Sequence, residues 1–142
     1  MTPGATDTRI VRRHLIALRR AIEELERHTG EPIEALDDWD ELRTVERGLQ
    51  LAAQNALDIA THLVAGAGCD VADYASAIDT LVTLGILDRD FAATFRSVAG
   101  FRNILVHGYL EVDLEIVHGV LNGRLGEFAS FADAVEQHIK RL

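Results

Sequence analysis

The chain has 142 residues, of which 48% are hydrophobic, so it is long enough for one domain with a continuous core. A single cysteine, Cys69, excludes an intrachain disulfide and a cysteine-rich zinc site, and a formal net charge of −9 argues against a generic nucleic-acid binder. The first residues lack a signal-peptide pattern and no stretch approaches the ~18 apolar residues of a membrane span, so we expect a cytoplasmic protein without membrane contact.

The first predicted helix runs from about Thr8 to His28 and ends before Gly30 and Pro32. One apolar stripe follows it at three- and four-residue spacing: Val11, Leu15, Leu18, Ile22 and Leu25. Thirteen of the fourteen basic residues are arginines, and six of these lie in this helix. They form either a local positive patch or pairs with neighbouring glutamates on a solvated face, and both interpretations stay open.

The second predicted helix begins at Asp38, a capping residue with Glu41 three positions later, and it ends at Gly66. Small alanines interrupt its apolar stripe, which allows a neighbouring helix to approach closely. We therefore expect this helix to be the central element of the fold. Trp39, near its start, is expected to be a core anchor and not a platform on which bases stack.

The rest of the chain predicts three more helices. The third covers about Val71 to Leu84, the fourth is capped by Asp88 and closes with the segment 102–109, and the last covers about Val112 to Arg141. Three glycines weaken or bend the last helix: Gly119, Gly123 and Gly126. The expected fold class is all-α, an antiparallel bundle of four to five helices that forms one domain over residues 1–142.

The end of the fourth predicted helix carries the side chains that are best suited to catalysis. Arg102, Asn103, His107 and Tyr109 lie within eight residues. An arginine binds phosphate oxygens bidentately, and a histidine transfers protons near neutral pH. Because RNA supplies its own nucleophile, the 2′-hydroxyl, these two groups suffice for a ribonuclease that needs no metal.

Arg102 and His107 are about 140° apart on an ideal helix and do not form a tight pair there. Three arrangements resolve this: the arginine side chain reaches around the helix, the helix loosens at Gly108, or a second copy of the chain supplies the facing residues. A symmetric dimer explains the most, because it surrounds one phosphate with two arginines and two histidines. An arginine and a histidine at a helix end also commonly bind terminal carbonyl groups, so the spacing alone is a weak signal.

The chain resembles the HEPN domains and, within them, the HepT-type toxins of bacterial HepT–MntA toxin–antitoxin systems. The family pattern of Arg, four residues, His, one residue, Tyr is matched by Arg102, His107 and Tyr109. The flanking segments 84–87 and 100–107 and the second predicted helix are also similar to the family, and the resemblance spans about residues 8 to 140.

The resemblance implies a homodimeric HEPN-like domain that acts as the toxin of a type VII system, a metal-independent endoribonuclease. Arg102 and His107 would be catalytic, and Asn103 occupies the polar position after the family arginine. A cognate MntA-like nucleotidyltransferase antitoxin would use ATP to attach AMP to Tyr109, which places negative charge where the RNA phosphate must sit. The partners are therefore RNA, the antitoxin and a second copy, and the chain itself needs no cofactor or metal.

Alternative interpretations remain for the function and for single residues. The first alternative is that the bundle is a non-catalytic partner or regulator of a nucleotidyltransferase. The second is that it is a purely structural helical dimer. For Tyr109, the alternative to AMP attachment is that its aromatic ring packs on the bundle. His62, four residues after Asp58, either lines the cleft or forms a surface hydrogen bond with that carboxylate.

Overall fold

The computed structural model describes residues 6–107 and 112–142, and every regular element in those ranges is helical. The elements are α1 (Thr8–Glu26), the 3-10 helix η1 (Ile33–Asp37), α2 (Trp39–Gly66), α3 (Tyr74–Thr83), α4 (Arg89–Phe95), α5 (Val98–His107), α6 (Leu114–Gly123) and α7 (Leu125–Lys140). The prediction of an all-α fold is therefore confirmed.

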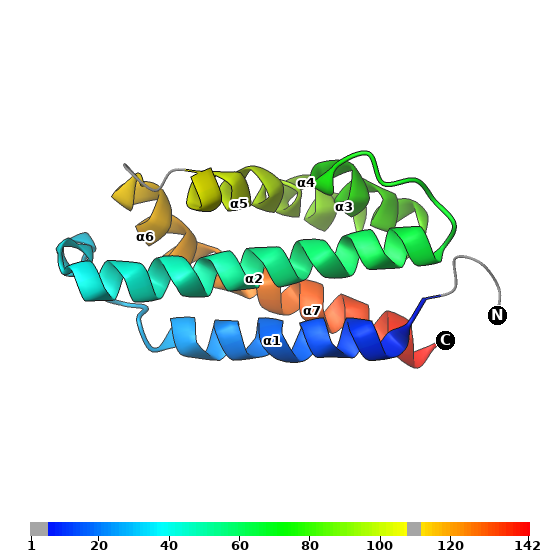
Figure 1. Cartoon of the computed structure of the whole chain (residues 1–142), viewed down its shortest axis with the longest axis horizontal. Coiled ribbons are helices and arrows are strands. Elements are labelled where there is room, and N and C mark those ends of the chain that lie inside the picture. Colours follow the sequence, from blue (N-terminus) through cyan, green and yellow to red (C-terminus); the bar gives the residue numbers. More distant parts are fainter. Residues whose placement is uncertain (1–5, 108–111) are drawn as a thin grey trace.

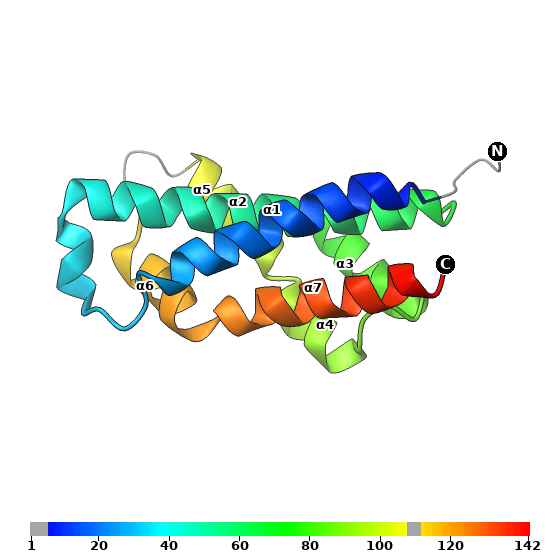
Figure 2. The same ribbon diagram turned by 90° about the horizontal axis from the view of Figure 1, so that it is seen from below.

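Helix α2 is the central element, as its alanine-rich stripe predicts. It lies between α1 and α5 in Figure 1, and it also contacts α3, α6 and α7. Seen from below, α1, α2 and α5 lie on one side of the molecule, and α4 and α7 lie on the other (Figure 2). The buried side chains of all these helices form one hydrophobic cluster, in which the rings of Phe95, Phe128 and Phe131 stack or meet edge to face.

The predicted helix starts are confirmed where a local carboxylate caps the backbone. Asp38 Oδ1 accepts a hydrogen bond from the Glu41 backbone N–H at 3.0 Å, and Asp88 accepts from the first turn of α4. Trp39 is not a core anchor: its side chain is 63% exposed and lies beneath the guanidinium of Arg43. Leu36, from η1, is buried at this end of α2 instead.

Two of the predicted helices are each divided in two. Between α4 and α5, the Ser97 hydroxyl donates to the Thr94 carbonyl at 2.9 Å, which competes with helical backbone bonding. Arg124 Nη2 donates to the same carbonyl at 3.2 Å and to Ser97 Oγ at 2.9 Å. Arg124 itself separates α6 from α7, since its backbone (φ −128°, ψ 4°) is not helical. The bundle therefore holds more and shorter helices than predicted.

The arginines of α1 do not pair with the glutamates of the same helix in the ion pairs that the structure describes. Arg19 instead donates to Asp133 and Glu136 of α7, each at 2.9 Å, and Arg9 pairs with Asp7.

In the described part of the chain, none of the helices is long and apolar enough to cross a membrane.

Candidate functional site

The guanidinium of Arg102 lies where α5 packs against α2 and α3. Its Nε donates to Gln54 Oε1 at 2.8 Å, and its Nη1 donates to Asn103 Oδ1 at 3.1 Å. The Arg102 Cζ lies 5.6 Å from the centre of the Tyr74 ring. The side chain is half-buried, and its hydrogen-bond acceptors among the described residues are neutral amides.

Gln54 is held in turn by a carboxylate one turn further along α2. Its Nε2 donates to Asp58 Oδ1 at 2.8 Å and lies 3.4 Å from the Tyr74 hydroxyl oxygen. The amide therefore accepts from Arg102 on one side and donates to Asp58 on the other. Three helices converge on this one guanidinium.

Other arginines in the described residues bind carboxylates directly. Arg96 donates to both oxygens of Asp79, at 3.0 and 3.1 Å, and Arg124 donates to both oxygens of Glu127, at 2.7 and 2.8 Å. The carboxylate hydrogen bonds raise the pKa of the Arg96 and Arg124 side chains. Arg102 is thus unlike them, because no partner carboxylate compensates its charge in the contacts described.

His107 is the last residue of α5, and its side chain is exposed. No hydrogen bond joins it to Arg102 within the described residues, because Arg102 turns toward Gln54 and does not reach around the helix. Asn103 is exposed, and its side-chain oxygen accepts a hydrogen bond from Arg102. The helix loosening at Gly108 and the position of Tyr109 lie outside the described residues.

The predicted pair of Asp58 and His62 does not form. His62 Nε2 accepts from the Asp7 backbone N–H at 3.3 Å, near the start of α1, and Asp58 accepts from Gln54. Sequence reasoning missed Gln54 altogether. Its spacing of four from Asp58 signals a helix-surface pair, but no local pattern connects it with an arginine 48 positions away.

The outward-facing side chains of α2 continue beyond Gln54 toward α1. The next residue, Asn55, bonds the His14 ring at 2.8 Å, so successive amides of α2 contact α5 on one side and α1 on the other. Leu51, one turn earlier, is 37% exposed. The α2 outer face, defined here as Leu51, Gln54, Asn55 and Asp58, is therefore polar with one exposed apolar side chain.

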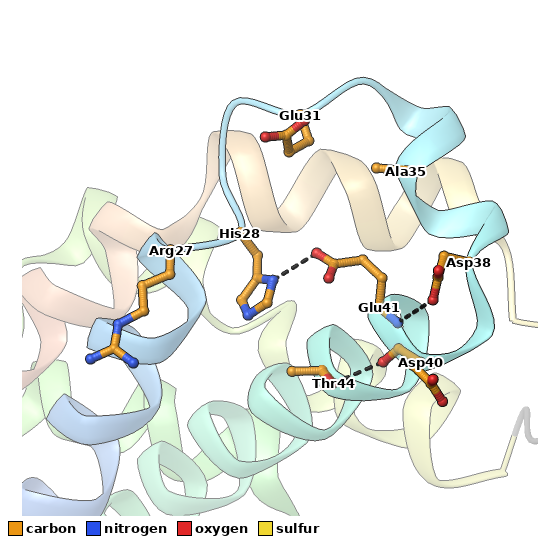
Figure 3. Close-up of a pocket in the computed structure, with 8 residues that line it drawn as sticks. All are labelled: Arg27, His28, Glu31, Ala35, Asp38, Asp40, Glu41 and Thr44. Carbon is orange, nitrogen blue, oxygen red and sulfur yellow. Dashed lines mark hydrogen bonds and ion pairs between the residues drawn. The ribbon is translucent and has the colours of Figure 1, made fainter.

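A pocket of about 560 Å³ lies elsewhere, where α1, η1 and the start of α2 meet (Figure 3). His28 Nδ1 lies 2.6 Å from Glu41 Oε1 in it. Its charged lining residues are Arg27, His28, Glu31, Asp38, Asp40 and Glu41. Carboxylates outnumber cationic groups there, so the pocket does not suit a phosphate.

In the described ranges, no group of three or more His, Cys, Asp or Glu side chains is placed to hold a metal ion.

Comparison with known proteins finds the same family along most of the chain. Residues 18–135 match the family described as Ribonuclease HepT-like. The chain is 31% identical over 102 residues to an Archaeoglobus fulgidus protein named as a candidate RNase, which covers 72% of this chain and 77% of that protein. It is 23% identical to the mRNA nuclease HepT of Shewanella oneidensis, over 89% of this chain and 96% of that protein.

Solved structures share the fold. A tri-AMPylated HEPN toxin of Shewanella oneidensis, solved in complex with an MNT antitoxin, has a TM-score of 0.80 at 22% identity and covers 90% of this chain and 97% of its own. The cytosolic protein of unknown function YutE from Bacillus subtilis has a TM-score of 0.84 at 14% identity and covers 96% and 92%.

Proposed function

This chain belongs to the Ribonuclease HepT-like family, and from that premise we propose that it is a toxin that cleaves RNA without a metal ion. The observation that carries the proposal is the state of Arg102. Its guanidinium is fixed on neutral acceptors at the surface between α2 and α5, so its positive charge is available to a phosphate.

In the proposed reaction, the RNA 2′-oxygen attacks the adjacent phosphorus and the bond to the 5′-oxygen breaks, which leaves a 2′,3′-cyclic phosphate. Arg102 holds the phosphate and stabilises the charge that develops on it. The His107 imidazole of the other copy accepts the proton from the 2′-hydroxyl and then donates it to the leaving 5′-oxygen. Asn103 orients Arg102 through its side-chain oxygen.

Two copies of the chain are needed for this arrangement. Within one copy, Arg102 bonds Gln54 while the exposed His107 makes no bond to it in the described residues. A two-fold dimer places the arginine of one copy opposite the histidine of the other. The largely polar, partly exposed α2 outer face, beside Arg102, is the surface we assign to this contact.

We further propose that a nucleotidyltransferase antitoxin silences the cleft through Tyr109. The tyrosine oxygen attacks the α-phosphorus of ATP, pyrophosphate leaves, and the tyrosine carries AMP two residues after His107. The added phosphate repels RNA at the site. The support comes from the family and from the similar Shewanella oneidensis toxin, which is tri-AMPylated and bound to an MNT antitoxin.

The test is cleavage of RNA by purified protein in the presence of a chelator. We expect products with 2′,3′-cyclic phosphate ends, and we expect Arg102→Ala and His107→Ala to abolish cleavage while both variants keep their helical circular dichroism. Unchanged cleavage in both variants would remove the assignment. A stable complex with a nucleotidyltransferase but no cleavage by the wild-type protein would favour the non-catalytic partner instead.

The modification has its own measurement. After incubation with the antitoxin and ATP, the intact mass should rise in steps of one AMP, and Tyr109→Phe should prevent the rise. Mass steps that persist in the Phe variant would place the modification elsewhere.

A further inference from the structure

We propose that Gln54 is the positioning residue for Arg102 and that its neutrality keeps the guanidinium uncompensated. The inference rests on the proposed function, because it assigns a role at the same cleft. Gln54 does not touch the RNA in this scheme. It fixes the arginine and separates it from Asp58.

The contacts place Gln54 on one edge of the guanidinium. Its Oε1 accepts from Nε at 2.8 Å, Asn103 accepts from Nη1, and the Tyr74 ring lies against Cζ. Within the described residues, Nη2 makes no hydrogen bond, and Nη1 has a second hydrogen. The terminal nitrogens are therefore left to bind an anion, while Nε anchors the group.

Asp58 strengthens this anchor without reaching the arginine. Its Oδ1 accepts a hydrogen bond from Gln54 Nε2 at 2.8 Å. The negative carboxylate beside the amide nitrogen polarises the amide group, which makes the Gln54 oxygen a better hydrogen-bond acceptor. If the carboxylate contacted Arg102 directly, the pair would resemble Arg96 with Asp79, in which the charge is compensated. Asp58 thus orients Gln54, and Gln54 orients Arg102. The carboxylate of Asp58 does not itself contact the guanidinium.

The first experiment separates positioning from a general loss of structure. Gln54→Met keeps the size of the side chain and removes its hydrogen bonds, including those with Arg102 and Asp58, and Gln137→Met is the matched control on the exposed surface of α7. We expect the Arg102 Nε–H signal in the ¹H–¹⁵N spectrum, assigned by its loss in Arg102→Lys, to broaden or disappear only in Gln54→Met. Cleavage measured as kcat/KM should fall about tenfold or more in Gln54→Met and stay unchanged in the control.

The second experiment exchanges the amide and the carboxylate. The double variant Gln54→Glu with Asp58→Asn preserves side-chain sizes, net charge and the hydrogen bond between the two residues, but places the carboxylate on Arg102. We expect the Arg102 Nε–H signal to remain sharp. Affinity for a fluorescent 2′-deoxy oligonucleotide, which lacks the attacking hydroxyl, should fall about tenfold relative to wild type because the guanidinium is now compensated.

The outcomes distinguish this inference from the proposed function. If wild-type protein neither cleaves RNA nor binds the oligonucleotide, the proposed function fails, whereas the Arg102 Nε–H signal still tests the contact with Gln54. An Nε–H signal that is unchanged in Gln54→Met would overturn the positioning role. Oligonucleotide binding by the exchanged variant at wild-type strength would overturn the role of neutrality.

Discussion

The planar shape of the Arg102 guanidinium allows one side chain to be anchored and to bind a ligand at the same time. One edge is occupied by Gln54, and Nη2 and the second hydrogen of Nη1 remain for the phosphate oxygens of the proposed substrate. A lysine ammonium has the same charge but no such division, because its donors share one atom. The site therefore requires arginine for its geometry as well as for its charge.

Arg102→Lys tests that requirement. Because lysine cannot bond Gln54 and hold a phosphate bidentately, we expect kcat/KM for metal-free RNA cleavage to fall about tenfold or more. The thermal unfolding midpoint should stay close to that of wild type, since the side chain is only half-buried. A lysine variant that cleaves as fast as wild type would show that charge alone is sufficient.

His138, near the end of α7, gives the molecule a pH dependence of stability. Burial disfavours the charged imidazole and Arg141 repels it, so the pKa of His138 lies below its usual 6.5. As the pH falls below 6.5, the unfolded chain gains a proton before the folded chain does, and folding stability is lost. We expect His138→Gln to lose less stability than wild type between about pH 7 and pH 5 in urea titrations. Equal losses in the two proteins would contradict the assignment.

At the scale of helices, the close approach of α1 to α2 depends on a missing side chain. A Cβ on Gly48 would lie 2.6 Å from Cδ2 and 3.0 Å from Cγ of the buried Leu25. Gly119 of α6, by contrast, has no neighbouring atom within 4 Å of such a position. The first glycine is required by packing, and the second is not.

Substitutions at these two glycines should therefore change stability in opposite directions. Gly48→Val overpacks the contact with Leu25 and should lower the free energy of unfolding by about 1–3 kcal/mol. Gly119→Ala should raise it by about 0.5–1 kcal/mol, because alanine favours a helix over glycine. Urea denaturation measures both, and a neutral Gly48→Val would show that Leu25 moves aside freely.

The sequence predicts helix starts better than helix breaks because caps are local. Asp38 and Asp88 bond backbone groups within three residues, so each cap is visible in a short window of sequence. At the break between α4 and α5, the local bond from Ser97 to Thr94 is joined by contacts from Arg124, which lies 27 residues after Ser97 and reaches it only in the folded chain. A window as short as the one that shows a cap does not contain both residues.

The same distinction applies to the candidate site. Arg102, Asn103 and His107 are close enough in sequence to form a motif, and in the structure Asn103 accepts a hydrogen bond from Arg102. Gln54 and Tyr74 come from α2 and α3, and their contacts with Arg102 depend on the packing of three helices. The sequence therefore supplies the proposed reacting groups of the site but not the groups that contact Arg102 from other helices.

At the scale of the whole molecule, one copy leaves the two proposed reacting groups apart. Arg102 is anchored on α2, and His107 is exposed at the end of α5 without a bond to it in the part of the chain that the structure describes. A site shared between two copies predicts that two different inactive variants can restore activity together, whereas a site within one copy does not. In a mixed dimer of Arg102→Ala and His107→Ala chains, one cleft lacks both groups, but the other receives an intact arginine from one chain and an intact histidine from the other.

Mixing the two inactive variants should therefore restore RNA cleavage. If the subunits exchange at random and one intact arginine–histidine pair suffices, about half of the dimers are mixed and carry one active cleft of two, so activity should reach about one quarter of wild type. Each variant mixed with itself is the control and should stay inactive. Activity that remains absent after unfolding and refolding the variants together, with mixed dimers verified by native mass spectrometry, would mean that arginine and histidine must come from the same copy.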